Sequence, residues 1–158
     1  MNKNKTQANI WVLNGPNLNM LGQRDQDIYG NIKLNDIKNR CQKACERHTF
    51  TTPTFIQSNS EGELVTAIHE ACSQADGLVV NMGAYSHTSL AIRDALDIFE
   101  GPVVEVHLSN IYAREPFRHH SHISAVADGV ICGLGIKGYE LAIDAIIAML
   151  SQTNNDAT

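Results

Sequence analysis

Glu105 and His107 are separated by one residue, Val106, at the end of a mainly apolar run, residues 102–106. This run has the composition of a buried strand. Side chains two positions apart on a strand point to the same face, so this carboxylate can orient this imidazole. An imidazole changes its protonation near neutral pH and can therefore give a proton to a departing hydroxyl. The pair predicts an acid–base site, and the alternative is a structural histidine at a strand end.

Arg24 and Tyr29 form a second candidate pair, within the stretch from Gly22 to Gly30. A free tyrosine has a pKa of about 10 and is a poor base, but a neighbouring guanidinium stabilises the phenolate and lowers that pKa. Residues 14–33 are rich in Gly, Asn and charge without a clear period, which favours a functional loop over a linker. The alternative is a surface tyrosine on a mobile loop.

Two other motifs suggest ligands but are incomplete. His119, His120 and His122 could be metal ligands, yet no Cys or carboxylate pattern nearby completes a recognised set, so we expect no metal. Residues 133–138 resemble a dinucleotide-binding glycine motif between a strand and a helix. They follow the last strand instead of the first, so we attribute these glycines to close packing between strand and helix.

These candidates depend on a framework of alternating strands and helices. Short apolar runs predict strands at residues 10–13, 54–56, 77–80, 102–106 and 129–132, and helical spacing predicts helices at 34–45, 64–72, 90–99 and 139–150. Ser60, with Glu63 three residues later, predicts the cap of the second helix. The pattern predicts a flavodoxin-like α/β fold, a three-layer sandwich with a parallel sheet of order 2-1-3-4-5. We expect one catalytic domain, residues 9–150, between a polar segment, 1–8, and a flexible tail, 151–158.

Polar residues gather where three of these strands end. Residues 14–17 follow the first strand, 81–89 follow the third, and 105–110 end the fourth. In a sheet of this order, ligands bind at the carboxyl ends of the strands, near the reversal between strands one and three. Any one of these segments is also explained by turn-forming residues. Together they favour a single site in one crevice.

Composition limits the partners of that site. The 158 residues include 12 Lys+Arg and 17 Asp+Glu, a net charge of −5 without long runs of like charge, so nucleic acid and membrane surfaces are not expected. The segments beside the polar motifs contain Arg24, Arg93, Arg114 and Arg118, which suit a small anion. Four scattered cysteines, a polar start and the lack of a long apolar segment predict a cytoplasmic protein.

Five motifs, in order, resemble type II 3-dehydroquinate dehydratase. They are NGPNLN (14–19), QSNSEGEL (57–64), NMGAYSHTS (81–89), EVHLSNI (105–111) and AREPFR (113–118). The resemblance covers nearly the whole chain. It implies a cofactor-free lyase of the shikimate pathway that removes water from 3-dehydroquinate by anti elimination through an enolate, giving 3-dehydroshikimate.

The resemblance also implies a role for each matching residue. Tyr29 is the base that takes the C2 proton, Arg24 lowers its pKa, and Asn17 helps to hold a water that stabilises the enolate. His107 protonates the departing C1 hydroxyl, and Glu105 orients His107. The resemblance implies that seven residues bind the substrate: Asn81, His87, Asp94, Leu108, Ser109, Arg114 and Arg118. Arg114 is also placed to order the catalytic loop.

One departure and two rival functions accompany the resemblance. The family's loop usually has Arg-Glu-Pro before the tyrosine, and here the sequence is Arg24-Asp25-Gln26, which removes a restraint on φ and predicts a more mobile lid. The resemblance implies a dodecamer, a tetramer of trimers. The rivals are a flavodoxin-like module that binds a cofactor or receives a phosphoryl group, and another cofactor-free lyase or isomerase of hydroxy acids.

Overall fold

The computed structural model describes residues 8–23, 26–48 and 52–156, with the side chains of Gln26, Tyr29 and residues 153–156 outside that description. Its centre is a parallel five-stranded sheet of order β2-β1-β3-β4-β5, which confirms the predicted topology. The strands are β1 (Ile10–Asn14), β2 (Thr54–Gln57), β3 (Gly77–Asn81), β4 (Val103–His107) and β5 (Gly129–Cys132). The α-helices are α1 (Gln26–Tyr29), α2 (Leu34–Arg47), α3 (Glu61–Gln74), α4 (Leu90–Asp97) and α5 (Lys137–Asp156).

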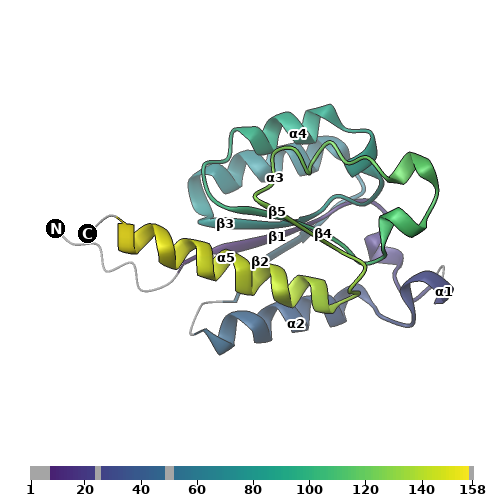
Figure 1. Ribbon diagram of the computed structural model, residues 1–158, viewed down its shortest axis with the longest axis horizontal. Helices are drawn as coiled ribbons and strands as arrows, with labels where there is room; N and C mark the ends of the chain where they lie inside the picture. Colours follow the sequence, from purple (N-terminus) through teal and green to yellow (C-terminus); the bar gives the residue numbers. More distant parts are fainter. Residues whose placement is uncertain (1–7, 24–25, 49–51, 157–158) are drawn as a thin grey trace.

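Helices cover both faces of the sheet, α2 and α5 on one side and α3 and α4 on the other (Figure 1). Alternate residues of β1 divide between the two cores: Ile10 and Val12 pack with α2 and α5, and Trp11 and Leu13 pack with α3 and α4. All four are buried because a parallel sheet is covered on both faces. The strand therefore appears in the sequence as a continuous apolar run.

The predicted helices are present, and their ends follow local chemistry. The hydroxyl oxygen of Ser60 accepts a hydrogen bond from the Glu63 amide at 3.3 Å, as expected for the cap of α3. α5 extends to Asp156 and so continues through residues that the sequence analysis assigned to a flexible tail. Most of the predicted N-terminal segment, residues 1–7, lies outside the described residues.

The connection from β4 to β5 differs from the other crossovers. It contains two short 3-10 helices, η3 (Ile111–Ala113) and η4 (Pro116–Arg118), followed by a segment without helix, residues 119–128. Ile123 in this segment is fully buried in the core beneath α3 and α4. The side chains of Val103, Glu105 and His107 point to the same face of β4, and an irregular segment covers that face.

Two further 3-10 helices, η1 (Leu18–Met20) and η2 (Gly83–His87), follow β1 and β3. No helix in the described ranges is both long and apolar enough to cross a membrane.

Candidate active site

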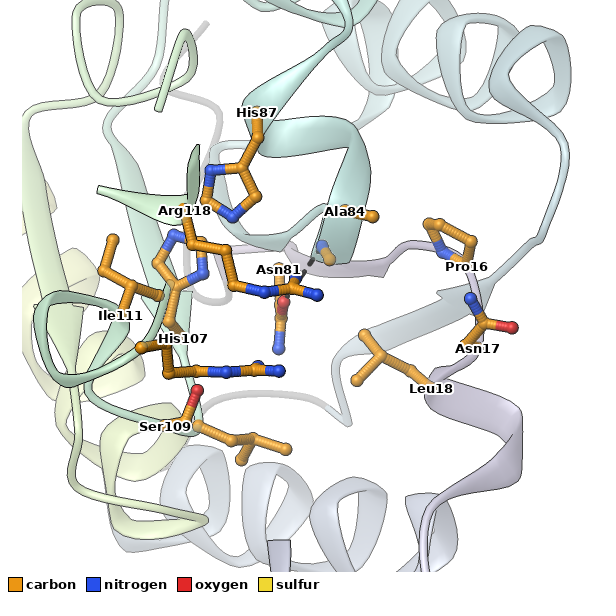
Figure 2. Close-up of a pocket in the computed structure, with 13 residues that line it drawn as sticks. Pro16, Asn17, Leu18, Asn81, Ala84, His87, His107, Ser109, Ile111 and Arg118 are labelled. Atoms are coloured by element: carbon orange, nitrogen blue, oxygen red, sulfur yellow. Dashed lines mark hydrogen bonds between the residues drawn. The ribbon is translucent and has the colours of Figure 1, made fainter. Parts of the chain in front are cut away.

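A pocket lies at the carboxyl ends of β1, β3 and β4, the place that the sequence analysis predicts (Figure 2). His87, His107 and Arg118 point into it from one side, and Leu18 lies on the opposite side, next to Pro16 and Asn17. Eight of the predicted site residues line it, namely Asn17, Asn81, His87, His107, Leu108, Ser109, Arg114 and Arg118.

Four predicted residues do not line this pocket as the structure describes it. Glu105 is buried directly behind His107. Asp94 lies on α4, where its side chain is 70% exposed and pairs with Arg93 at 2.7 Å, so this chain does not bring it to the pocket. Arg24 and the side chain of Tyr29 lie outside the described residues.

The loops after β1 and β3 cross in close contact, and this crossing requires glycine. A Cβ on Gly15 would stand 2.3 Å from the backbone oxygen of Met82, which is far inside van der Waals contact. The Gly15 amide also donates to the carbonyl of Asn81 at 2.7 Å. The two loops therefore hold Asn17 and Asn81 at a fixed spacing.

The loop after β2 supports the loop after β1. The backbone amide of Asn17, which has a φ of 66°, donates to the Asn59 side-chain oxygen at 2.9 Å. Gln57 donates to the carbonyl of Gly15 at 3.2 Å and to Asn59 at 3.1 Å. The QSNSEGEL motif thus braces the NGPNLN motif from the neighbouring strand.

Glu105 and His107 form a buried pair, as predicted from their spacing. The Oε1 atom of Glu105 lies 2.7 Å from Nε2 of His107, and the two residues are 0% and 5% exposed. An ionised carboxylate only accepts, so Nε2 carries a hydrogen and donates it. Nδ1 is then the nitrogen of His107 left for a bound molecule.

Glu105 has two further hydrogen-bond donors, both from the segment after η4. The hydroxyl of Ser121 donates to Oε1 at 2.5 Å, and the hydroxyl of Ser124 donates to Oε2. Burial by itself would raise the pKa of Glu105, but the hydrogen bonds and positive charge of His107, with the two serine donors, outweigh it and lower the pKa. Glu105 therefore stays an anion inside the protein.

His87 lies beside His107 with its ring centroid 6.0 Å away, but it has a different partner. Its Nδ1 is 2.7 Å from the carbonyl of His120, which can only accept, so Nδ1 carries the hydrogen. Burial is the main cause that lowers the pKa of His87, and the nearby charges of His107 and Arg118 lower it further. The hydrogen bond to His120 acts in the opposite direction but is outweighed. At neutral pH His87 is therefore neutral and offers Nε2 as an acceptor.

A buried chain of hydrogen bonds forms the floor below Asn81. The Asn81 amide nitrogen donates to the Tyr139 hydroxyl at 2.8 Å, and that hydroxyl donates to the Asn14 side-chain oxygen at 2.7 Å. The Oδ1 atom of Asn81 accepts from the Gly83 amide at 3.2 Å. Burial raises the pKa of Tyr139, which remains a neutral phenol. These contacts fix the side chain of Asn81 and leave one of its amide hydrogens for a ligand.

The rim of the pocket is cationic. Arg114 and Arg118 line it, and no lining residue in the described part of the chain is Asp or Glu. Glu115, just outside, accepts from Arg118 at 2.9 Å and lies 3.6 Å from Arg114, which fixes both guanidinium groups without removing their net charge. This rim favours an anionic ligand.

The glycine motif of residues 133–138 has a structural explanation. The amides of Gly133 and Gly135 donate to the carbonyls of His107 and Leu108, and a Cβ on Gly133 would approach Asn110 to 3.0 Å, so these glycines fasten β5 to the end of β4. Among the residues that the structure describes, no three His, Cys, Asp or Glu side chains form a group able to hold a metal ion.

Sequence reasoning missed two kinds of site residue. Ser121, Ser124 and Tyr139 reach the site through tertiary folding, and no local spacing marks them. Other residues of the pocket wall are small or apolar and lie inside the motifs, but the sequence analysis gave them no individual role: Pro16, Leu18, Gly83, Ala84 and Ile111.

Comparison with known proteins gives one consistent result. The family model described as dehydroquinase class II matches residues 8–147. A 3-dehydroquinate dehydratase from Cereibacter sphaeroides is 54% identical over 140 residues, covering 89% of this chain and 95% of its own. One from Streptomyces avermitilis is 52% identical, covering 99% of this chain and 100% of its own.

Solved structures agree with the sequence relatives. A type II dehydroquinase from Butyrivibrio crossotus has a TM-score of 0.86 and 43% identity, covering 90% of this chain and 99% of its own. One from Propionibacterium acnes has a TM-score of 0.84 and 42% identity, covering 90% of this chain and 98% of its own. The chain therefore belongs to the class II dehydroquinase family.

Proposed function

We infer that the chain catalyses the reaction for which its relatives are named, the removal of water from 3-dehydroquinate. The product is 3-dehydroshikimate, an intermediate on the route to chorismate and the aromatic amino acids. The observation that carries this inference is the buried Glu105–His107 pair at the wall of a cationic pocket. It supplies an acid for a leaving hydroxyl and attraction for a carboxylate substrate.

The elimination needs a proton removed from C2 and a hydroxyl lost from C1. We assign the second step to His107: as an imidazolium, it gives the Nδ1 proton to the C1 hydroxyl, which leaves as water. The negative charge of Glu105 stabilises the imidazolium and holds its Nε2–H. The electron pair of the enolate then forms the C1–C2 double bond.

The base is assigned from the family resemblance. Tyr29, as a phenolate favoured by Arg24, removes the C2 proton, and the electrons move to the C3 oxygen as an enolate. Asn17, on the wall opposite His107, holds a water against that oxygen. The mechanism uses no cofactor, because each proton has a side chain to take or give it.

The remaining site residues bind the substrate. Asn81 and neutral His87 offer a donor and an acceptor to its hydroxyls, as their internal partners imply. Leu108, Ser109 and Arg118 line the side next to His107, and Arg114 orders the loop that carries Tyr29. For Asp94 we keep the role implied by the resemblance, as a substrate contact that this chain alone does not complete.

The assembly and location are also proposals. We propose a dodecamer, a tetramer of trimers, in the cytoplasm. Large apolar side chains on the surface support association: Leu90, Ile98, Tyr112, Phe117, Val130 and Leu134 are 43–69% exposed, and Val130 lies on the edge strand β5.

The direct test is ultraviolet absorbance after 3-dehydroquinate is added to the purified chain. The product is an enone, so absorbance should rise, and the rise should persist after EDTA. It should also persist after borohydride treatment with substrate, since no lysine lines the described pocket. Inactivation by borohydride only when substrate is present would reveal a Schiff base and overturn the mechanism. A coloured protein without this activity would instead favour a flavin-binding module.

A further inference from the structure

The segment after η4 contacts His87 and also Glu105, the partner of His107, and we call residues 120–124 the brace. Its Ser121 and Ser124 donate to the two oxygens of Glu105, the partner of His107. The carbonyl of His120 accepts from His87. The brace therefore contacts Glu105, which is the partner of His107, and also the ring of His87.

We propose that Ser121 and Ser124 are positioning residues for the dehydration, holding the Glu105 carboxylate in the orientation that presents Oε1 to His107. This rests on the proposed function, since it concerns the acid of that reaction. The two hydroxyls act through Glu105 and do not touch the substrate pocket.

The direction of the Ser121 hydrogen bond is set by a third group. The Ser121 oxygen accepts from the amide of Ile123 at 3.2 Å, so its own hydrogen is available for Glu105 at 2.5 Å. Ser124 donates to the other carboxylate oxygen. With one hydroxyl on each oxygen, rotation of the carboxylate would break both contacts.

Orientation matters because Glu105 is 0% exposed, and no bulk water can replace a lost donor. A carboxylate held in one position keeps Nε2–H as the donor of His107 and leaves Nδ1 for the departing hydroxyl. Without the serines the carboxylate would rotate or take up a proton. His107 would then lose its fixed tautomer and its stabilising charge.

The brace has anchors that do not involve these hydroxyls. The amide of His122 donates to the carbonyl of Ser86 at 2.8 Å, and Ile123 is fully buried. Removing one hydroxyl should therefore leave the segment in place. A change in catalysis can then be separated from a loss of folding.

The experiment compares Ser121→Ala, Ser124→Ala and their double variant with wild type, using Ser73→Ala on the exposed end of α3 as the matched control. For the double variant we expect kcat to fall about tenfold or more at neutral pH, with KM changed less than about twofold. The acid side of its kcat profile should move to higher pH, because the Glu105 anion has lost two donors. Ser124→Thr, which keeps the hydroxyl, should restore most of the activity that Ser124→Ala loses.

A second measurement reports which nitrogen of His107 carries the hydrogen, independently of turnover. Nitrogen-15 NMR of wild type should show the neutral form of His107 protonated at Nε2, and the double variant should show a mixture of tautomers. If the double variant does not fold, Ser124→Ala, at a half-buried position, provides both measurements.

The outcomes separate this proposal from the function on which it rests. Folded variants with unchanged kcat, pH profile and His107 tautomer would overturn the positioning role, while wild-type activity on 3-dehydroquinate would leave the function standing. A lower melting temperature alone, with those three readouts unchanged, would also overturn it. If wild type fails to dehydrate 3-dehydroquinate, the proposed function fails, and the catalytic role of the serines fails with it.

Discussion

His87 and His107 lie side by side with ring centroids 6.0 Å apart, yet their hydrogen-bond acceptors differ in charge. The acceptor of His107 is the anionic carboxylate of Glu105, and the acceptor of His87 is the uncharged carbonyl of His120. Burial lowers the pKa of His87 even though that hydrogen bond opposes the shift. Two residues of one type can therefore act as a proton donor and a hydrogen-bond acceptor in one pocket. Their different roles come from their neighbours and not from their own chemistry.

His107→Ala should lower kcat by ~10²–10⁴-fold, the usual contribution of a general acid, while substrate still binds. Glu105→Gln should lower kcat less, since it keeps a hydrogen-bonding group beside the ring but loses the charge. His69→Ala, on the exposed face of α3, is the control and should match wild type in the ultraviolet assay. Wild-type turnover in His107→Ala would contradict the assignment of the acid.

Tyr29→Phe should abolish nearly all turnover with little effect on folding, because the ring remains but has no oxygen to take the C2 proton. Arg24→Ala should retain the base with a pKa nearer to about 10, so its activity should recover in part as pH rises. Steady-state kinetics from neutral to alkaline pH measure both effects. If Tyr29→Phe keeps most of its turnover, the base is another residue, with His87 the first to test.

At the scale of elements, the strands and the polar residues at their ends could be predicted because each depends on a local pattern, whereas the strand order followed from the rules for alternating strands and helices. β1 and β3 are apolar runs that end in Asn14 and Asn81, so both the sheet and the start of the pocket are visible in the sequence. Glu105 and His107 are two residues apart, and that spacing alone predicted their contact.

The β4 to β5 crossover could not be predicted in the same way. Its residues lack a helical or strand period, and their contacts reach back 16 and 19 positions from Ser121 and Ser124 to Glu105. Tyr139 fits the apolar face of α5, and only the assembled fold reveals that its hydroxyl reaches Asn14 and Asn81. Side-chain identity in an irregular segment carries no information about which distant group it will meet.

Gly15→Ala should destabilise the chain by ~1–3 kcal/mol, the usual cost of overpacking, because its Cβ would meet the backbone at Met82. Activity should fall as well, since the crossing loops hold Asn17 and Asn81. Gly62→Ala in α3 is the matched control, because its Cβ would have only the Ser60 hydroxyl oxygen nearby, at 3.9 Å. Urea unfolding of both variants measures the difference, and equal stability would contradict the close approach of the loops.

At the scale of the whole molecule, a buried anion makes stability depend on pH. The folded pKa of Glu105 is lowered, so its contribution is complete above the ordinary carboxyl pKa of about 4.3 and is lost as pH falls through the lower folded value. The unfolding free energy of wild type relative to Glu105→Gln should thus be constant above about pH 5 and decline below about pH 4. Denaturant titrations at several pH values measure it, with exposed Glu70→Gln as the control, and a flat difference would contradict the shift.

Association is the second property of the whole molecule. If the proposed dodecamer forms, sedimentation velocity should give a native mass about twelve times that of the 17.3 kDa chain. The twelve-fold number comes from the family resemblance, and large apolar side chains on the surface, such as Phe117, 69% exposed, and Leu134, 54% exposed, support association. Leu134→Asp should weaken the assembly, and Asn39→Asp, at an exposed polar position on α2, serves as the control for added charge. A fully active monomer would contradict the dodecamer.

The hydrogen bond from Tyr139 to Asn14 joins residues 125 positions apart and closes the floor of the pocket. During synthesis, every strand leaves the ribosome before Tyr139 does, so Asn14 and Asn81 emerge well before the hydroxyl that joins them. The pocket can take its final shape only after the first turns of α5 have emerged from the exit tunnel. A ribosome-stalled chain whose residue 139 is still inside the exit tunnel should therefore be unable to turn over substrate, which makes catalytic competence one of the last properties acquired in translation.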